Sequence, residues 1–473
     1  MSQTADAPAR HHARWVVAAL CTGTLLSALN SGMVAVALST LRREFGVDVA
    51  TVTWVISVFY LTSAVLQPVM GRLADRYGPR RVFAIGMWTV ALAGALGPFA
   101  PNLVVLCAVR VLLAIGTATA FPSAAAMLRA VAATSGGNAT KMIGRIQLVD
   151  TSSAAIGPVL GGLLIVAFGW PAIFWINIPL AALALVSTGI LAPRDAPRTR
   201  VPLRRTLGEA DLPGVTLFVV AVATLLVFLL ELADDPPWFL LPVIAAAVAL
   251  FGWHELRAAT PFIDLRLLAA NTPLVRVYAL FILANLVFYG ALFGIPQYLE
   301  DHAGYRTDLI GVLLLPLAAF NVVTAPLVER LIDRSGLQRT LVIGLGALTV
   351  GALALPLLGA STAAWAVLAA TAAVGIPYVF VLVSITQSLY VAAPSEHVGQ
   401  AAGLFQTARS LGCIGAAVVV GLSFSGGTDP ADWLVLATAT VGLAVATLVV
   451  ALAWRPRRTI SAQVHPNPPD PAK

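Results

Sequence analysis

The sequence has 473 residues and a formal net charge of +7, and 59% of its residues are hydrophobic while only 11% are charged. Because a soluble globular chain carries roughly 25% charged residues, this composition excludes an ordinary soluble protein and indicates a chain surrounded mainly by lipid. The basic residues are dispersed among short loops without an aromatic-rich platform, so we do not expect a nucleic-acid partner. No metal-ligand cluster, nucleophile–base arrangement or phosphate-binding loop is visible, and we therefore expect no enzyme activity, metal or cofactor.

Fourteen apolar runs follow one another along the chain, each long enough or nearly long enough to cross a bilayer as a helix. They cover residues 15–38, 51–71, 82–99, 103–128, 143–167, 171–191, 212–232, 238–254, 274–298, 308–328, 340–358, 363–390, 400–423 and 432–454. An even number of spans places both chain ends on one side of the membrane. Most basic residues fall on that side, and only Arg42, Arg43 and Arg306 fall on the other. The charge asymmetry predicts that both termini are cytoplasmic.

The connection between the second and third runs is the polar stretch GRLADRYGPRR at 71–81. Gly71 would let two helices approach closely, Gly78 suits a turn with positive φ, and Asp75 can accept hydrogen bonds from a neighbouring helix N-terminus. A second copy, ERLIDRSGLQR at 329–339, places Asp333 258 residues after Asp75. This repetition predicts two related halves, as in many transporters. The residues of the two copies are Gly71, Asp75, Arg76, Gly78, Arg80, Arg81, Asp333, Arg334 and Gly336.

This motif resembles the signature loop of the major facilitator superfamily, and a chain with fourteen spans resembles the drug:proton antiporter branch of that superfamily. The resemblance covers nearly the whole chain. It implies an all-α polytopic membrane protein with the major facilitator fold, two six-helix bundles and two inserted helices, fourteen transmembrane helices in all. The expected organisation is an N-terminal bundle at 1–192, a cytoplasmic linker at 193–211, inserted helices at 212–254, a second cytoplasmic linker at 255–273, a C-terminal bundle at 274–454 and a cytoplasmic tail at 455–473.

The fifth run contains GPVLGG at 157–162, with the residues Gly157, Pro158, Gly161 and Gly162. Three glycines and a proline predict a bent helix that packs closely against a neighbour. The segment resembles the helix 5 motif of antiporters in this superfamily, and ordinary tight packing is the alternative interpretation. We expect it to shape a gate and not to bind substrate.

Arg110, Asp150 and Arg409 fall well inside apolar runs, away from their ends, where an unpaired charge is costly. Arg110 resembles the helix 4 arginine that the family associates with proton transfer, although Leu113 and Ala114 stand where relatives have a polar residue and a glycine. The alternative is an arginine that only braces the bundle. Asp150 and Arg409 occupy equivalent positions of the two halves, so we expect both to face a central cavity and to serve a gate or proton coupling. Direct pairing is one possibility, and side chains that reach the inner surface are the alternative.

The first run contains LNSGMVAVALS at 29–39, which resembles a family pattern but has Asn30 where relatives carry an aspartate. Because asparagine does not titrate, it excludes a proton carried at this position. Either Asp150 takes that role or the coupling differs, and a specificity restricted to cationic drugs is less expected. The predicted cavity residues are Asn30, Tyr60, Gln67, Gln147, Asn177, Asn285, Tyr289, Asn321, Tyr378, Gln387 and Gln406. For each of them, a structural bond between helices is the alternative.

The resemblance implies a secondary transporter of the plasma membrane that exports amphipathic drugs or antibiotics by proton antiport with alternating access. The expected partners are an amphipathic small molecule, protons and the lipid bilayer, and we expect a monomer. A proton-coupled or passive importer of a small metabolite is an alternative, and a non-transporting membrane sensor is another. The paired signature loops argue against a sensor, which has no need of moving gates.

Overall fold

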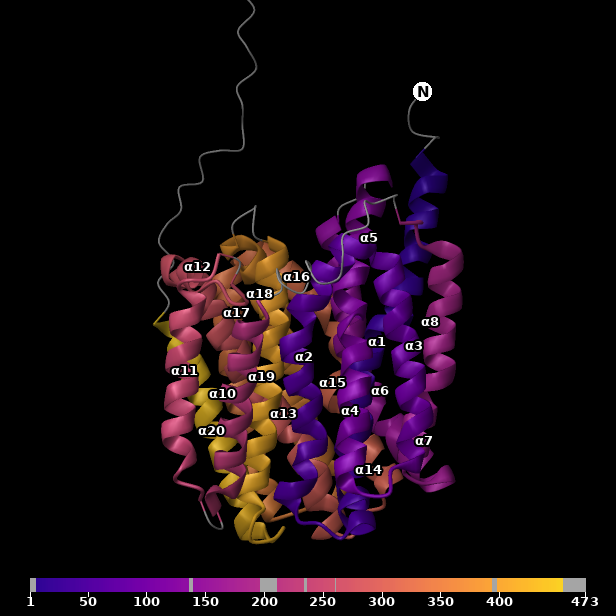
Figure 1. Cartoon of the computed structure of the whole chain (residues 1–473). Helices are drawn as coiled ribbons and strands as arrows, with labels where there is room; N and C mark the ends of the chain where they lie inside the picture. The colour runs from indigo at the N-terminus through magenta and orange to yellow at the C-terminus, as the bar shows by residue number, and fades with distance from the viewer. Residues whose placement is uncertain are drawn as a thin grey trace, which may run out of the picture.

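The computed structural model describes residues 6–135, 139–195, 211–233, 236–259, 261–393 and 398–453. Within these ranges the chain is helical and has no strand. Long helices run side by side, with the earliest helices on the right of Figure 1 and the later ones on its left. Helices satisfy their backbone hydrogen bonds internally, as lipid requires of a spanning segment. The predicted all-α polytopic membrane architecture is confirmed.

The helices fall into three successive groups. The first comprises α1 (Asp6–Phe45), α2 (Val49–Tyr77), α3 (Pro79–Leu96), η1 (Gly97–Phe99), α4 (Leu103–Ala118), α5 (Ala120–Ser135), α6 (Ala139–Phe168), α7 (Ala172–Trp175) and α8 (Asn177–Leu191). The second comprises α10 (Leu212–Leu230), η2 (Glu231–Ala233), α11 (Leu240–Glu255) and α12 (Leu265–Ala270). The third comprises α13 (Thr272–Asp301), α14 (Thr307–Leu313), α15 (Leu315–Ala319), α16 (Asn321–Ser335), α17 (Leu337–Ala352), η3 (Pro356–Gly359), α18 (Ala364–Ala392), α19 (Val398–Ser423) and α20 (Pro430–Leu452).

Twelve helical segments of the described residues are long and apolar enough to cross a membrane. Two of the predicted runs coincide with shorter apolar helices, Leu240–Glu255 and Thr307–Leu317. The second of these is interrupted near Pro316, which has no N–H to donate to the carbonyl one turn earlier. Fourteen spans therefore remain a prediction, compatible with this arrangement.

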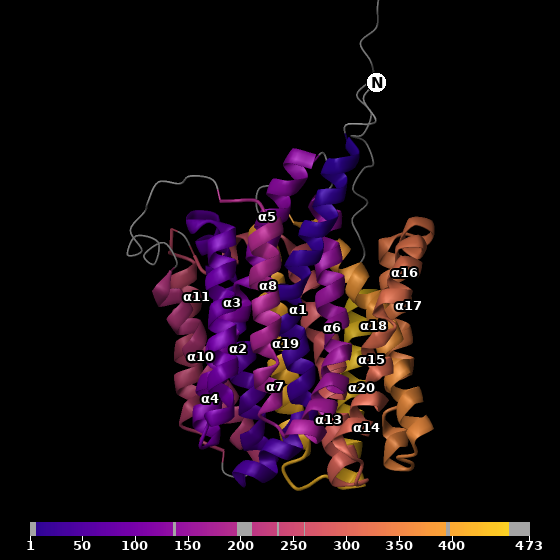
Figure 2. The same ribbon diagram turned by 90° about the vertical axis from the view of Figure 1, so that its right-hand side faces the viewer.

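The first and third groups repeat the same neighbours. α1 packs against α6, and α13 packs against α19; α3 packs against α4, and α17 against α18. The two groups meet where α2 lies on α19, where α1 lies on α13, and where α6 lies on α14 and α15. Figure 2, turned by a quarter, shows α6 beside α14 and α15. These contacts form the seam between the groups.

The stretch 71–81 makes a tight turn from α2 into α3, and its second copy makes the same turn from α16 into α17. Gly78 has a φ of 104° and Gly336 has a φ of 84°, values that favour glycine. Gly78 N donates to Ala74 O at 3.1 Å, and Gly336 N donates to Ile332 O at 2.9 Å. We call the end of the bundle that carries these two turns the arginine-rich end; it is the upper end in Figure 1.

Helices α10 and α11 pack on each other, and α10 also contacts α2 and α19. A small apolar cluster joins these elements: Ala64 and Val65 of α2 meet Phe218 of α10 and Phe262 of the segment after α11. The rings of Phe218 and Phe262 lie 5.5 Å apart. The range 255–273, predicted as a linker, is thus held against the bundle and contains α12, because its apolar side chains have a surface to cover.

A buried polar cluster fixes this segment to the start of α10. Asp211, which has a left-handed φ of 51°, accepts from His254 Nε2 at 2.6 Å, from Gly214 N at 3.1 Å and from Phe262 N at 3.0 Å. Glu255 accepts from Ile263 N at 2.9 Å. Burial opposes ionisation of Asp211, but these hydrogen bonds outweigh it and hold the pKa of the carboxyl below its ordinary value.

We expect Gly214→Ala to loosen this cluster, because a Cβ at Gly214 would press on the carboxylates of Asp211 and Glu255. Hydrogen exchange of peptides covering residues 256–264 should become faster. Gly252→Ala on α11 is the matched control, because a Cβ there has nothing within 4 Å. Equal exchange in both variants would contradict the role given to the cluster.

Close contact between α1 and α6 depends on glycine. A Cβ at Gly157 would lie 2.7 Å from the Cα of Gly32 and 2.7 Å from the carbonyl oxygen of Leu29, both backbone atoms that cannot turn aside. The GPVLGG stretch therefore brings two helices into backbone contact, the arrangement that small residues permit in membranes.

Gly157→Leu should lower the free energy of unfolding by about 1–3 kcal/mol through overpacking. Thermal unfolding of the purified protein in detergent measures this loss. Gly442→Leu on α20 should leave the midpoint unchanged, because a Cβ at Gly442 has nothing within 4 Å. Similar midpoints for the two variants would refute the packing argument.

Candidate functional site

Asp150 of α6 and Arg409 of α19 form a buried ion pair across the seam. Arg409 Nη1 lies 2.6 Å from Asp150 Oδ2, and the two side chains are 8% and 4% exposed. Sequence reasoning left this direct pairing open, and the structure brings the two residues together. Because removing two charges from water is costly, the pair stabilises the bundle only while both partners are present.

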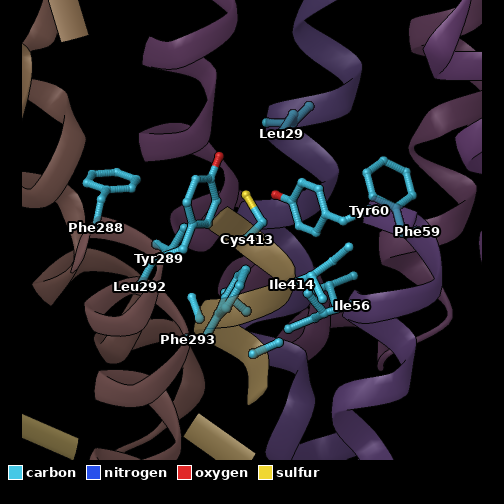
Figure 3. Packing of buried hydrophobic residues seen from close by; sticks show 14 of the residues in the cluster. Leu29, Ile56, Phe59, Tyr60, Phe288, Tyr289, Leu292, Phe293, Cys413 and Ile414 are labelled. Atoms are coloured by element: carbon cyan, nitrogen blue, oxygen red, sulfur yellow. The ribbon is translucent and has the colours of Figure 1, made fainter. Parts of the chain in front are cut away.

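Aromatic and hydroxyl side chains from three helices lie in the middle of the bundle. Figure 3 shows Tyr60 of α2 and Tyr289 of α13 on either side of Cys413 of α19. The two rings are 5.9 Å apart and nearly perpendicular. Tyr378 of α18 donates to Asn285 Oδ1 of α13 at 3.0 Å. The structure therefore gathers four of the predicted cavity residues in the centre, on helices of both groups.

Arg110 of α4 is 1% exposed and lies against α2. Its Nε donates to the carbonyl oxygen of Val55 at 3.1 Å, and its guanidinium lies 4.3 Å from the centroid of the Phe59 ring. Its Nη1 is buried without a partner, and no carboxylate among the described residues pairs with it. Arg110 thus remains a buried cation held by a carbonyl and an aromatic ring.

Asn30 of α1 and Asn177 of α8 bond to each other. Asn30 Nδ2 donates to Asn177 Oδ1 at 2.7 Å, and Asn177 Nδ2 donates to Asn30 Oδ1 at 3.2 Å. Asn30 also donates to the carbonyl of Leu26 in its own helix, and Asn177 donates to the carbonyls of Ile173 and Phe174 in α7. Neither residue lines the cavity described next, so Asn30 and Asn177 form a satisfied amide pair away from it.

A cavity of about 870 Å³ lies at the arginine-rich end, between α2, α5, residues 259–264 and α19. Of the predicted residues, Gln67, Gly71, Asp75, Arg76 and Gln406 line it. The Oε1 atoms of Gln67 and Gln406 are buried without a partner. Gln406 stands three residues before Arg409 on α19, less than one helical turn. The inner end of the cavity therefore comes within about one helical turn of the level of Arg409, although neither member of the ion pair lines it.

The opposite end of the seam is closed by ion pairs between α1 and α13. Arg42 Nη2 lies 2.7 Å from Asp301 Oδ1, and Glu300 accepts hydrogen bonds from Arg43 and Ser39. Glu300 lies near the end of α13. The structure shows that its partners come from the other group of helices.

The GPVLGG residues of α6 add to this closure. A Cβ at Gly162 would lie 3.0 Å from the Cα of Asp308, and a Cβ at Gly311 would lie 2.5 Å from the carbonyl oxygen of Pro158. Gly161 packs in the same way on Met33 of α1. The motif thus brings α6 into backbone contact with α1 on one side and with α14 on the other.

At the first signature turn, the acid that caps the helix is Asp195 and not Asp75. Asp195 accepts from the backbone N of Arg80 at 3.0 Å and of Arg81 at 3.1 Å. Asp75 lies in the last turn of α2, where it is exposed and lines the cavity. Asp195 lies at the start of the predicted linker, where nothing in the sequence indicated contact with α3.

The remaining predicted residues are scattered. Gln147 is buried on α6 and Gln387 is half-buried on α18. Asp333 and Arg334 are exposed at the second turn. The side chain of Asn321 lies outside the described residues.

Removing one partner of the buried Asp150–Arg409 pair should lower the free energy of unfolding by more than the intact pair contributes to it. Asp150→Asn and Arg409→Gln should each lower the free energy of unfolding by about 3–5 kcal/mol, because each leaves one charge uncompensated, and the double variant should lose less than their sum. Thermal unfolding in detergent gives the four stabilities of the cycle. A matched cycle of Asp150→Asn with Arg110→Gln should be additive, and additivity of both cycles would contradict the pair.

A family model for the Major Facilitator Superfamily matches residues 20–417. The chain is 33% identical over 406 residues to the MFS-type transporter YwoD of Bacillus subtilis, covering 86% of this chain and 89% of that protein. It is 31% identical over 431 residues to the tetracenomycin C resistance and export protein of Streptomyces glaucescens, covering 88% and 77% of the two chains. A solved proton-dependent oligopeptide transporter shares the fold with a TM-score of 0.66 at 15% identity, covering 93% and 97% of the chains. This chain belongs to the major facilitator superfamily.

Proposed function

We propose that this transporter exports amphipathic small molecules, including drugs or antibiotics, in exchange for protons. The observation that carries the proposal is the buried Asp150–Arg409 pair, which joins α6 to α19 within about one helical turn of the inner end of the cavity. A titratable acid at that point can link proton occupancy to the contact between the two groups of helices. The name of the tetracenomycin C export relative supports the direction of transport.

We also propose the arrangement in the membrane. The arginine-rich end faces the cytoplasm with both termini, since basic residues concentrate there. The membrane is the plasma membrane, and the protein is a monomer. The two six-helix bundles occupy 1–192 and 274–454, with helices α10 and α11 as the insertion.

Transport proceeds by rocking of the two bundles about the central site. In the arrangement seen here, the cavity lies at the arginine-rich end, and the α1–α13 ion pairs close the other end. Opening to the outside requires Arg42 and Arg43 to leave Asp301 and Glu300. The signature turns at 71–81 and 329–339 help to close the arginine-rich end in the outward-open arrangement. A ligand shifts this equilibrium only by binding the two arrangements with different affinities.

Asp150 is the proposed proton carrier. Protonation of Asp150 removes the negative charge that holds Arg409, so the α6–α19 contact weakens when a proton binds. Asn30 does not titrate and is bonded to Asn177, so it does not share this role. Arg110 contributes a fixed positive charge from α4.

A second candidate function is proton-coupled or passive uptake of a small metabolite. Asn30 favours it, since the acid that relatives use for antiport is replaced by an amide. In that case Asp150 and Arg409 serve only as a gate between the bundles.

The test is proton movement in liposomes that contain the purified protein and a pH-sensitive dye. Amphipathic compounds, both charged and neutral, are added under an imposed pH gradient. We expect at least one compound to evoke proton flux in the parent protein, and we expect Asp150→Asn to abolish that flux, because the amide carries no proton.

Glu231→Gln is the matched control, since it makes the same chemical change at an exposed residue near the end of α10. It should retain the flux of the parent. Substrate movement without proton flux would refute antiport and leave the passive candidate.

A further inference from the structure

We propose that the substrates are organic anions, amphipathic molecules with an aromatic body and one acidic group, and that lipophilic cations are excluded. This inference rests on the proposed export function and names its substrate class. It follows from where the described charges lie along the path from the arginine-rich end to the centre of the bundle.

The centre of the bundle keeps one uncompensated positive charge. Arg110, Asp150 and Arg409 are the charged side chains that the structure describes as buried between the two ends of the bundle. Asp150 and Arg409 neutralise each other at 2.6 Å, and Arg110 has only the Val55 carbonyl and the Phe59 ring. A guanidinium does not lose its proton, so two cations and one carboxylate leave one positive charge. In a region of low dielectric this charge attracts anions strongly.

The same two arginines offer unused donors. Arg110 Nη1 and Arg409 Nε are both buried without a hydrogen-bond partner. An incoming carboxylate or sulfonate accepts hydrogen bonds from guanidinium groups and compensates their charge. An incoming cation neither accepts these hydrogen bonds nor compensates the positive charge. It would also have to displace Arg409 from Asp150.

Among the residues that the structure describes, no unpaired acid lies in the centre to receive a cation. The α1 position that could carry one is Asn30, and its side chain is bonded to Asn177 and to its own helix. Separation of Asp150 from Arg409 by a bound cation would leave two guanidinium groups uncompensated, which adds a large desolvation cost.

The mouth of the cavity has the same sign of charge. Three arginines line it, Arg72, Arg76 and Arg129, together with two acids, Asp75 and Asp264. The carboxylate of Asp264 accepts from two backbone N–H groups in the first turn of α12, and Arg72 Nη2 donates to the carbonyl oxygen of Pro261 at 3.0 Å. These bonds leave the charges unchanged, so three cations and two anions give the mouth one net positive charge. A mouth of net positive charge raises the local concentration of anions and lowers that of cations.

The cavity walls suit the rest of such a molecule. Phe121 of α5 and Phe262 of the segment before α12 supply aromatic surface, and Gln67 and Gln406 supply carboxamides at the inner end. A volume of about 870 Å³ accommodates a drug-sized molecule.

The sign of the substrate charge decides how exchange responds to voltage. A monovalent anion that leaves while one proton enters moves two positive charge equivalents inward. A monovalent cation that leaves for one proton moves none. An inside-negative potential therefore drives exit of the anion and leaves cation exchange unaffected.

The experiment uses two xanthene dyes of similar shape and fixed charge, sulforhodamine B with one net negative charge and rhodamine 6G with one positive charge. Each is loaded into liposomes containing the full chain, with an acidic medium outside and protein-free liposomes as the blank. Potassium inside and valinomycin impose an inside-negative potential.

We expect protein-dependent exit of sulforhodamine B together with proton entry. A potential of ~100 mV should raise the final depletion by more than about 50-fold, the change that one moving charge allows, since two charges move. Rhodamine 6G should show no protein-dependent exit. Arg129→Gln at the mouth should slow sulforhodamine B exit about threefold at low ionic strength, with the difference lost at high salt. The control Arg145→Gln changes an exposed arginine of α6 outside the cavity and should have no effect.

The outcomes separate this inference from the proposed function. Rhodamine 6G exit coupled to protons and indifferent to voltage would overturn the anion assignment and leave antiport standing. Sulforhodamine B exit without proton entry would support the anion assignment and overturn antiport. If the protein in the liposomes is folded, as its unfolding midpoint shows, and it moves neither dye, the anion assignment is overturned.

Discussion

The arrangement of this bundle depends on one buried ion pair, Asp150 with Arg409. Asp150 and Arg409 are buried and cannot be solvated by bulk water, so each charge is stabilised only by the other. They stand on helices of different groups, and their contact therefore couples the position of one half to that of the other. Everything that changes the charge of either partner, above all a proton on Asp150, acts directly on the seam.

The two ends of the seam use different chemistry. At the end away from the arginine-rich turns, glycine brings α6 against α14, and ion pairs tie α1 to α13. At the arginine-rich end, the helices part around a cavity whose walls carry both charge and aromatic rings. Backbone contact resists partial opening because packed surfaces separate as units. Such an interface favours two distinct arrangements over a continuum.

The sequence was sufficient for features that follow from local rules. Apolar length predicted twelve spans that the structure shows as long apolar helices, while two more predicted runs coincide with shorter helices. The repeated loop predicted two turns with glycine at positive φ, which Gly78 and Gly336 adopt. The reciprocal bond of Asn30 with Asn177 and the capping of α3 by Asp195 were not predictable. Both join residues more than 100 positions apart, and no periodicity or charge pattern encodes which distant partner a polar group will meet. The Asp150–Arg409 contact was predictable only in part. The internal repeat indicated that the two residues lie at equivalent depths in the membrane, but it did not indicate that they touch.

Helix α10 of the second group contacts helices of both other groups. It touches α2 from the first group and α19 from the third, so it bridges the two groups of helices. The Asp211 cluster also ties α10 to the segment that walls the cavity. In the proposed rocking cycle, α10 therefore has to give up contacts with one of the two groups whenever they move apart.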